Sequence, residues 1–354
     1  MVAAQKLSIS NYGQAANNTR IEYFDEGGMM ELRTNHMHKN IIDCSIMTNN
    51  SAVDEVQWYF SDLYENINLK NNGYKDILSW CVDILNESPS ARLMLKEVSE
   101  KDWQVTLEDL NGGDYCIDVE QKLLILDNNS LEPEALSRSD YFKNITFITM
   151  VKALRDIWQE KRHGGFDELY SPEYILLMER ARAADLDVVS IMVAWELRSY
   201  EYSEIWRHII GSEIGDMAMA FSGYLERDPS SQFNGQALSH SFKQWFRCLS
   251  RINSCDRDIL EYMDDLLASS DITNPFGVKR PSKMNIEILS CLPDKTAYLQ
   301  GFGAEILSDP AYSSLDNEIN QTHLFHIMYD LEAVIINNVP FRDKELARKI
   351  FPTD

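Results

Sequence analysis

Residues 54–100 carry helix-like patterns of hydrophobic and polar residues. Apolar residues recur at intervals of three and four over 74–86, the spacing that places them on one face of an α-helix. A similar pattern covers 54–66, and another helix is expected over 91–100, after the break at Ser88-Pro89-Ser90. Residues 1–50 are polar and rich in asparagine without a sustained period, which indicates a poorly ordered arm or a peripheral hairpin.

The period then shortens to two, which is typical of β-strands. Apolar and polar residues alternate over 103–107 and again over 115–119, and residues 122–126 form a short apolar run. Glycines and polar residues at 111–114 favour a turn, since glycine adopts positive φ at little cost, and Glu120-Gln121 can form a second turn. The segment therefore predicts a three-stranded antiparallel meander.

Two long helical patterns follow the predicted strands. The first, residues 141–162, ends at His163-Gly164-Gly165, where glycine is the expected stop signal. The second begins with Ser171 as N-cap and Pro172 at the first helical position. The apolar stripe of the first helix consists of Phe147, Val151, Leu154 and Trp158, and that of the second runs through Leu177, Ala181, Ala184, Val188, Ile191 and Trp195.

The rest of the chain is also mainly helical in pattern. Residues 271–283 hold two prolines and a glycine, which favours a long loop or linker. Helices are expected over 203–226, around 242–249, and over 256–268, 322–338 and 343–350. The whole pattern predicts an α+β, mainly α fold with a small antiparallel sheet. We expect three parts: a polar arm over 1–50, an α+β core with a helical extension over 51–275, and a helical segment over 276–354 packed on the core.

The charge and the cysteines narrow the classes of function. The chain has 56 Asp and Glu against 33 Lys and Arg, a formal net charge of -23. Such an excess opposes binding to phosphate backbones and anionic membranes, so we expect no nucleic-acid and no membrane partner. The six cysteines form no C-x-x-C pair, and no apolar run approaches the roughly 20 residues that span a bilayer. We expect a cytoplasmic protein with reduced thiols.

The first long helix invites comparison with zinc hydrolases. An H-E-x-x-H motif places two histidine ligands on one side of a helix, and its glutamate is the general base toward the zinc-bound water. The sequence has no such motif; the register that fits best is Lys152 to Asp156, with Ala153 at the glutamate position. A protonated lysine repels a divalent cation, and alanine cannot activate water. Lys152 and Asp156 are expected to form an i,i+4 ion pair on the helix surface, contributing roughly 0.2–0.5 kcal/mol.

Other groups of residues that could bind a metal give weaker evidence for a metal site. His36 and His38 lie in the polar arm, where a solvated pair is the simpler interpretation. His323, His326 and Asp330 share a helical spacing but have no further ligand near them in sequence. The chain contains no G-x-S-x-G, G-x-x-x-x-G-K-[ST] or G-x-G-x-x-G motif, so neither a serine hydrolase nor a nucleotide-binding loop is indicated.

Three longer stretches carry a family resemblance: GGDYCIDVEQKLLILDN, FITMVKALRDIWQ and MERARAADLDVVSIMVAWEL. They resemble a bacterial family of zincin-like metallopeptidases, whose pattern has a sheet edge, a helix with H-E-L-R-H-x-W-Q and a helix with R-x-x-E-A-D. The resemblance covers roughly residues 90–354 and implies a zincin-like core. The retained motif residues are Leu154, Arg155, Trp158, Gln159, Arg180, Ala184 and Asp185. The replaced ones are Lys152 and Asp156 for the histidines and Ala153 and Ala183 for the glutamates.

The resemblance leaves three functional hypotheses. The leading one is a catalytically degenerate relative of zinc metallopeptidases that works as a protein-binding or structural module, with no metal and no cofactor. The alternative is an active hydrolase with zinc on a shifted set, Asp156, Asp185 and His163. The third is a structural or oligomer-forming protein with no inherited site. If the ancestry holds, residues 152, 156, 183 and 185 converge on one cleft floored by the sheet.

Overall fold

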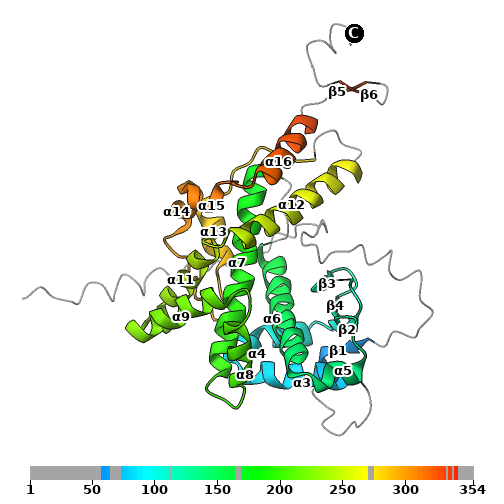
Figure 1. Cartoon of the computed structure of the whole chain (residues 1–354), viewed down its shortest axis with the longest axis vertical. Helices are drawn as coiled ribbons and strands as arrows, with labels where there is room; N and C mark the ends of the chain where they lie inside the picture. The colour runs from blue at the N-terminus through cyan, green and yellow to red at the C-terminus, as the bar shows by residue number, and fades with distance from the viewer. Residues whose placement is uncertain are drawn as a thin grey trace, which may run out of the picture. The chain divides into compact units, whose positions relative to one another are not determined.

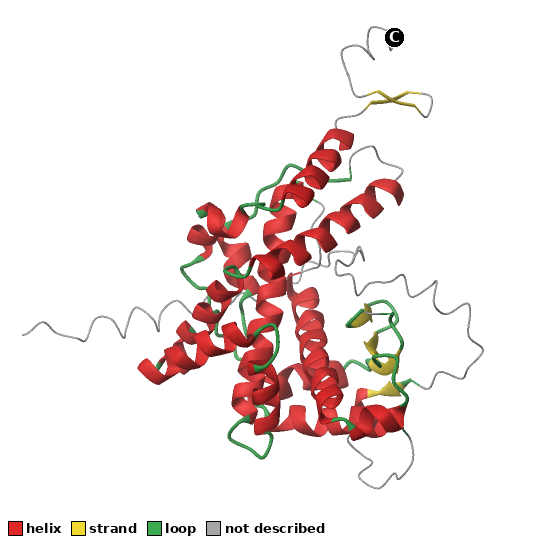
Figure 2. Ribbon diagram, in the orientation of Figure 1, coloured by secondary structure: helices red, strands yellow, loops and turns green. Residues whose placement is uncertain are grey.

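The computed structural model of the chain is mainly helical, with strands confined to short segments (Figures 1 and 2). This confirms the expected α+β, mainly α class. The described residues are 57–63, 73–111, 113–163, 169–269, 275–331, 334–336 and 339–341. The predictions for the arm over 1–50, for His36 and His38 and for the helix over 343–350 lie outside them.

A four-stranded mixed sheet replaces the expected antiparallel meander. It consists of β1 (Trp58–Tyr59), β2 (Gln104–Glu108), β3 (Tyr115–Asp118) and β4 (Leu123–Asp127). The strand order is β1-β2-β4-β3, so β4 lies between β2 and β3, parallel to β2 and antiparallel to β3. Residues 123–126 of β4 are all buried. A strand that is apolar on both faces belongs in the middle of a sheet, and the meander would have left β4 at an edge.

The helix expected over 54–66 is wrong for the residues described there. Trp58 and Tyr59 form β1, which pairs antiparallel with β2, and a short 3-10 helix, η2 (Phe60–Leu63), follows. The Phe60 amide donates to the carbonyl of Trp103 at 3.1 Å, which continues the pairing beyond β1. Backbone pairing with a neighbouring strand therefore overrides the local helical pattern, because every buried backbone polar group needs a partner.

Two helices between β1 and β2 are joined by a single residue. α3 (Tyr74–Glu87) and α4 (Pro89–Ser99) meet at Ser88, which ends the first and caps the second. The Ser88 hydroxyl accepts a hydrogen bond from the Ala91 amide at 3.1 Å, and Pro89 occupies the first position of α4, where no amide is needed. The expected break at 88–90 is confirmed. After the sheet, the short α5 (Pro133–Arg138) leads into the long helices.

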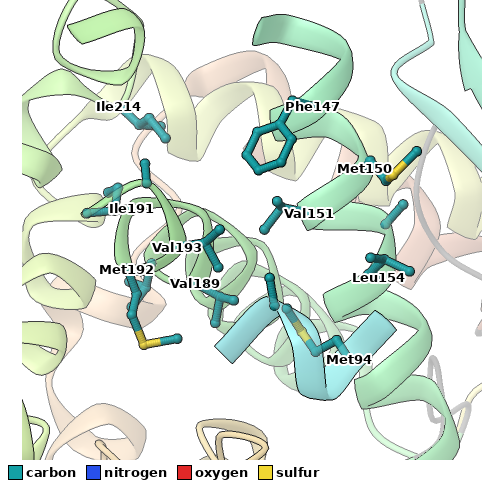
Figure 3. Packing of buried hydrophobic residues seen from close by; sticks show 14 of the residues in the cluster. Met94, Phe147, Met150, Val151, Leu154, Val189, Ile191, Met192, Val193 and Ile214 are labelled. Carbon is teal, nitrogen blue, oxygen red and sulfur yellow. The ribbon is translucent and has the colours of Figure 1, made fainter. Parts of the chain in front are cut away.

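The core is centred on two long helices, α6 (Asp140–His163) and α7 (Pro172–Leu197), which pack against each other. Figure 1 shows them side by side, with the sheet next to α6, and contacts join α6 to both β3 and β4. Apolar side chains of α4, α6 and α7 point toward one another in Figure 3, among them Met94, Val151 and Val193. α7 is buried around most of its circumference, so it is a core helix rather than a surface one.

The helix expected over 203–226 is divided into α8 (Ser203–Ile210) and α9 (Gly215–Arg227). Residues 211–214 separate them, and the chain turns so tightly that a Cβ at Gly215 would lie 2.2 Å from the carbonyl oxygen of Ile210. α10 (Ser231–Asn234) and α11 (Gln236–Trp245) follow. The sequence pattern missed the division because both helices are amphipathic and the break carries no proline.

The last third of the described chain contains α12 (Leu249–Ser269), α13 (Lys283–Leu289), α14 (Gly303–Ser308), α15 (Pro310–Ser313) and α16 (Glu318–Leu331), then β5 (Val334–Ile336) and β6 (Val339–Phe341). The expected helix over 322–338 is wrong in its last part, since residues 334–336 pair as a strand with 339–341. α12 packs against both α7 and α16. Among the described helices, none has the length and apolar composition that a membrane crossing requires.

Candidate functional site

Lys152 and Asp156 of α6, at the positions compared with the zinc motif, face charged residues of α7. Lys152 Nζ lies 2.7 Å from Asp187 Oδ1, and Arg182 Nη2 lies 2.7 Å from Asp156 Oδ1. As the residue number rises along α6 it falls along α7, so the two helices run antiparallel. Each charge finds its counter-charge across the helix pair, and the i,i+4 pair expected between Lys152 and Asp156 is not the contact that either makes.

Asp156 is held through both carboxylate oxygens. Oδ1 accepts from Nε and Nη2 of Arg182 at 3.1 and 2.7 Å, and Oδ2 accepts from the Tyr115 hydroxyl of β3 at 3.0 Å. Arg182 also donates to Glu160 Oε2 at 3.0 Å. Burial disfavours the Arg182 cation, but the attraction of Asp156, Glu179 and Glu160 outweighs it and raises the arginine pKa. The position that the motif assigns to a histidine therefore holds a carboxylate bound to a guanidinium.

Lys152 is held by Asp187 of α7, which α11 holds in turn. Its partner Asp187 also accepts a hydrogen bond from the Trp245 indole of α11, at 3.0 Å from Nε1 to Oδ2. Burial lowers the pKa of Lys152, but the nearby negative charges, chiefly Asp187, more than compensate and raise it. The amine is thus a cation at neutral pH. Ala153, at the position of the general base, is fully buried among apolar residues.

Three retained motif residues meet in a second, fully buried group. Arg155 donates to both oxygens of Asp185, at 2.6 Å from Nε and 3.2 Å from Nη2, and Gln159 Nε2 donates at 2.5 Å. The Tyr298 hydroxyl completes the shell of Asp185 at 2.7 Å. Arg155 also donates to the carbonyls of Leu289 and Cys291, both at 3.0 Å. These contacts tie α6 and α7 to the segment around α13.

The other retained residues lie apart from this group. Arg180 forms a two-point ion pair with Asp256 of α12, at 2.5 and 2.8 Å, and donates to the Tyr312 carbonyl. Trp158 is half-buried under the guanidinium of Arg162, 3.1 Å from the ring centre. Arg180 and Trp158 therefore contact different neighbours from Arg155, Gln159 and Asp185, and the buried Trp158 Nε1 has no hydrogen-bond partner among the described residues.

Glu179 is a buried acid that the sequence alone did not single out. Its side chain is 5% exposed, and its Oε2 atom has no hydrogen-bond partner. Burial raises the pKa of Glu179 to about 7, Arg182 opposes the rise, and Asp156 and Glu160 add to it. One signal was available: charged residues in a helix as apolar as α7 have to be buried in pairs. That signal also points to Arg182 and Asp187.

The residues present do not fit a zinc ion. Each ionisable side chain at the motif positions of α6 is paired with an opposite charge on α7, and Lys152 is itself a cation. No group of three or more His, Cys, Asp or Glu in the described part of the chain has an arrangement that could hold a metal. In the shifted set, Asp156 and Asp185 are bound by different arginines, and the side chain of His163 lies outside the described residues.

The histidines of α16 do not assemble a metal site in the described region either. His323 pairs with Asp264 of α12, and the ring of His326 is exposed beside that of Phe325. The side chain of Asp330 lies outside the described residues.

Comparison with protein families gives one match, over residues 75–299, to a family described as "Putative metallopeptidase family (DUF6782)". The matched span runs from α3 to the segment after α13 and includes every residue of the α6–α7 contacts. Comparisons with curated proteins and with solved structures return no match. Because the match covers well over half of the chain, the chain belongs to this putative metallopeptidase family.

Proposed function

We propose that this chain is a catalytically degenerate member of its family, with a zincin-like ancestry, which works as a protein-binding or structural module. One observation carries the proposal: the positions where the motif calls for two zinc ligands hold a cation and a guanidinium-bound carboxylate. The chemistry of this site is the pairing of charges between α6 and α7, and that pairing stabilises the helix pair.

Electrostatics support the absence of a metal from this site. Two unit charges 4 Å apart interact by about 4 kcal/mol at an effective dielectric constant of about 20, and a divalent ion doubles that figure. A zinc ion placed near Lys152 would meet such a repulsion, while Asp156 would have to exchange its contacts with Arg182. The buried Ala153 supplies no base. At the described motif positions of α6, neither Lys152 nor Ala153 can bind zinc or activate water, and Asp156 is already bound by Arg182.

Metal analysis of the purified full-length chain tests the proposal. We expect far less than one zinc per chain after dialysis, and the same content in Asp156→Ala. One tightly bound zinc per chain that Asp156→Ala removes would overturn it.

The same protein can be assayed on a broad peptide library. We expect no peptidase activity above that of a denatured control. Activity that Asp156→Ala abolishes would instead support the alternative, an active hydrolase with zinc on Asp156, Asp185 and His163. In that alternative, both carboxylates would have to leave their arginines, Arg182 and Arg155, before a metal could bind.

A further inference from the structure

A surface groove lies at the meeting point of α12 and α16, away from the α6–α7 contacts. It has a volume of about 390 Å³ and is lined by Leu249, Asn253, Asp316, Asn317, Glu318 and Ile319. Two of its residues come from the start of α12 and four from the first turn of α16 and the residues just before it. The last four lie beyond the residues that match the family.

The walls of the groove are fixed by hydrogen bonds. Asn317 caps α16, since its Oδ1 accepts from the amides of Ile319 and Asn320 at 3.0 and 3.1 Å. The buried Asn320 then donates from Nδ2 to the carbonyl of Asn253 at 2.9 Å, which joins the first turn of α16 to α12. The groove is therefore preformed, and a partner would pay little to order it.

The rim of the groove is apolar. Leu249 is 57% exposed and Ile319 is 77% exposed, and they come from different helices. Apolar side chains that flank a shaped depression are typical of sites where a partner inserts a side chain.

The charge of the groove is negative. Asp316 and Glu318 are exposed, and neither forms an ion pair with any described residue. The arginines of α12 are occupied elsewhere, Arg251 by Asp216 and Arg257 by Asp258 and Glu261. The amino end of α16 offsets about half a unit of charge, so most of the charge of the two carboxylates remains.

We infer that this groove binds a segment of a partner protein in which a lysine or arginine is flanked by apolar residues. The basic group would lie between Asp316 and Glu318, and the flanking residues would cover Leu249 and Ile319. The net charge of -23 favours encounter with a basic partner, because long-range attraction raises association rates. The inference deepens the protein-binding role proposed above, on which it rests for the class of partner.

Fluorescence anisotropy with labelled peptides tests the inference on the full-length chain. The probes are peptides of alternating leucine and arginine, with leucine–serine and leucine–glutamate peptides as controls. We expect only the basic peptide to bind and its affinity to fall with added salt. The double variant Asp316→Asn/Glu318→Gln is expected to raise the Kd about tenfold, since it removes two exposed ion pairs.

A matched double variant, Glu134→Gln/Glu226→Gln, removes the same net charge from other exposed positions, and we expect it to leave the Kd within about twofold. Ile319→Ser tests the apolar rim without changing the charge and is expected to weaken binding as well. The inference is overturned if the basic peptide does not bind. It is also overturned if the two double variants weaken peptide binding equally, or if neither variant weakens it. Displacement of the peptide by an equimolar divalent cation would overturn it too. The zinc content of the protein tests the proposed loss of catalysis separately. A lack of peptide binding would therefore contradict the groove inference without contradicting that proposal.

Discussion

Glu179→Gln should change how the stability of this protein depends on pH. The folded chain buries the Glu179 carboxyl between α6, which carries Asp156 and Glu160, and α12, which carries Cys255, whose own pKa Glu179 helps to raise. Arg182 is the nearby cation, and it donates to Asp156 and Glu160. Glutamine has nearly the same shape as the protonated acid but cannot ionise, so the substitution isolates the charge.

The sign follows from comparing the folded and unfolded chains. The ordinary pKa of 4.5 applies to the unfolded chain, and burial raises the folded value to about 7. Below pH 4.5 both forms hold the proton, and the group has no effect on the free energy of unfolding. Between 4.5 and 7 only the unfolded chain loses its proton, so stability falls as pH rises, and above 7 the loss is complete. At about 1.4 kcal/mol per pKa unit, the total decrease in the free energy of unfolding is about 3 kcal/mol.

Urea denaturation at pH 5 and pH 8 measures this effect. We expect the free energy of unfolding of Glu179→Gln, measured relative to the wild type, to be about 2–3 kcal/mol higher at pH 8 than at pH 5. Glu173→Gln, in the exposed first turn of the same helix, is the control and should show no such gain. If the difference between Glu179→Gln and the wild type is the same at both pH values, the reasoning about this buried acid is refuted.

Two further predictions concern the supports of the long helices. Arg155→Met leaves Asp185 buried without its guanidinium and should cost about 3–5 kcal/mol in urea denaturation, whereas Lys96→Met, at an exposed pair, should cost less than about 1 kcal/mol. Equal costs would mean that the buried pair stabilises no more than a surface one. Gly215→Ala should destabilise the protein by about 1–3 kcal/mol, because the new Cβ would meet the Ile210 carbonyl. Gly223→Ala, in the same helix, is the control: its Cβ would have no atom within 4 Å, so this variant should stabilise the protein by about 0.5–1 kcal/mol. A stable Gly215→Ala variant would show that the turn can relax.

The sequence was a good guide to elements whose signals are local. The helix junction at Ser88 and the two long helices follow from caps, prolines and apolar periodicity, and they form where expected. The order of the strands was a harder problem, because hairpin-like turns suggested an antiparallel meander. The apolar run of β4 does indicate a central strand, since a strand buried on both faces needs a neighbour on each side.

The partners of the charged residues could not be predicted in the same way. Lys152 and Asp156 have the spacing of an intrahelical pair, and only the packing of α6 against α7 shows that Asp187 and Arg182 are the partners. The register between two helices depends on the whole interface, so no local pattern fixes it. The stretches that carry the family resemblance include both helices, and the family match covers them as well.

The reciprocal pairing of α6 with α7 limits how this protein could acquire a zinc site by evolution. Replacing Lys152 by histidine leaves Asp187 buried without its cation, and replacing Asp156 by histidine leaves Arg182 without one of its two acids. Breaking a buried pair costs about 3–5 kcal/mol, against a typical total stability of about 5–15 kcal/mol. Each single step toward H-E-x-x-H would therefore pass through a weakened protein. Forming such a site without this loss of stability would require paired changes on both helices.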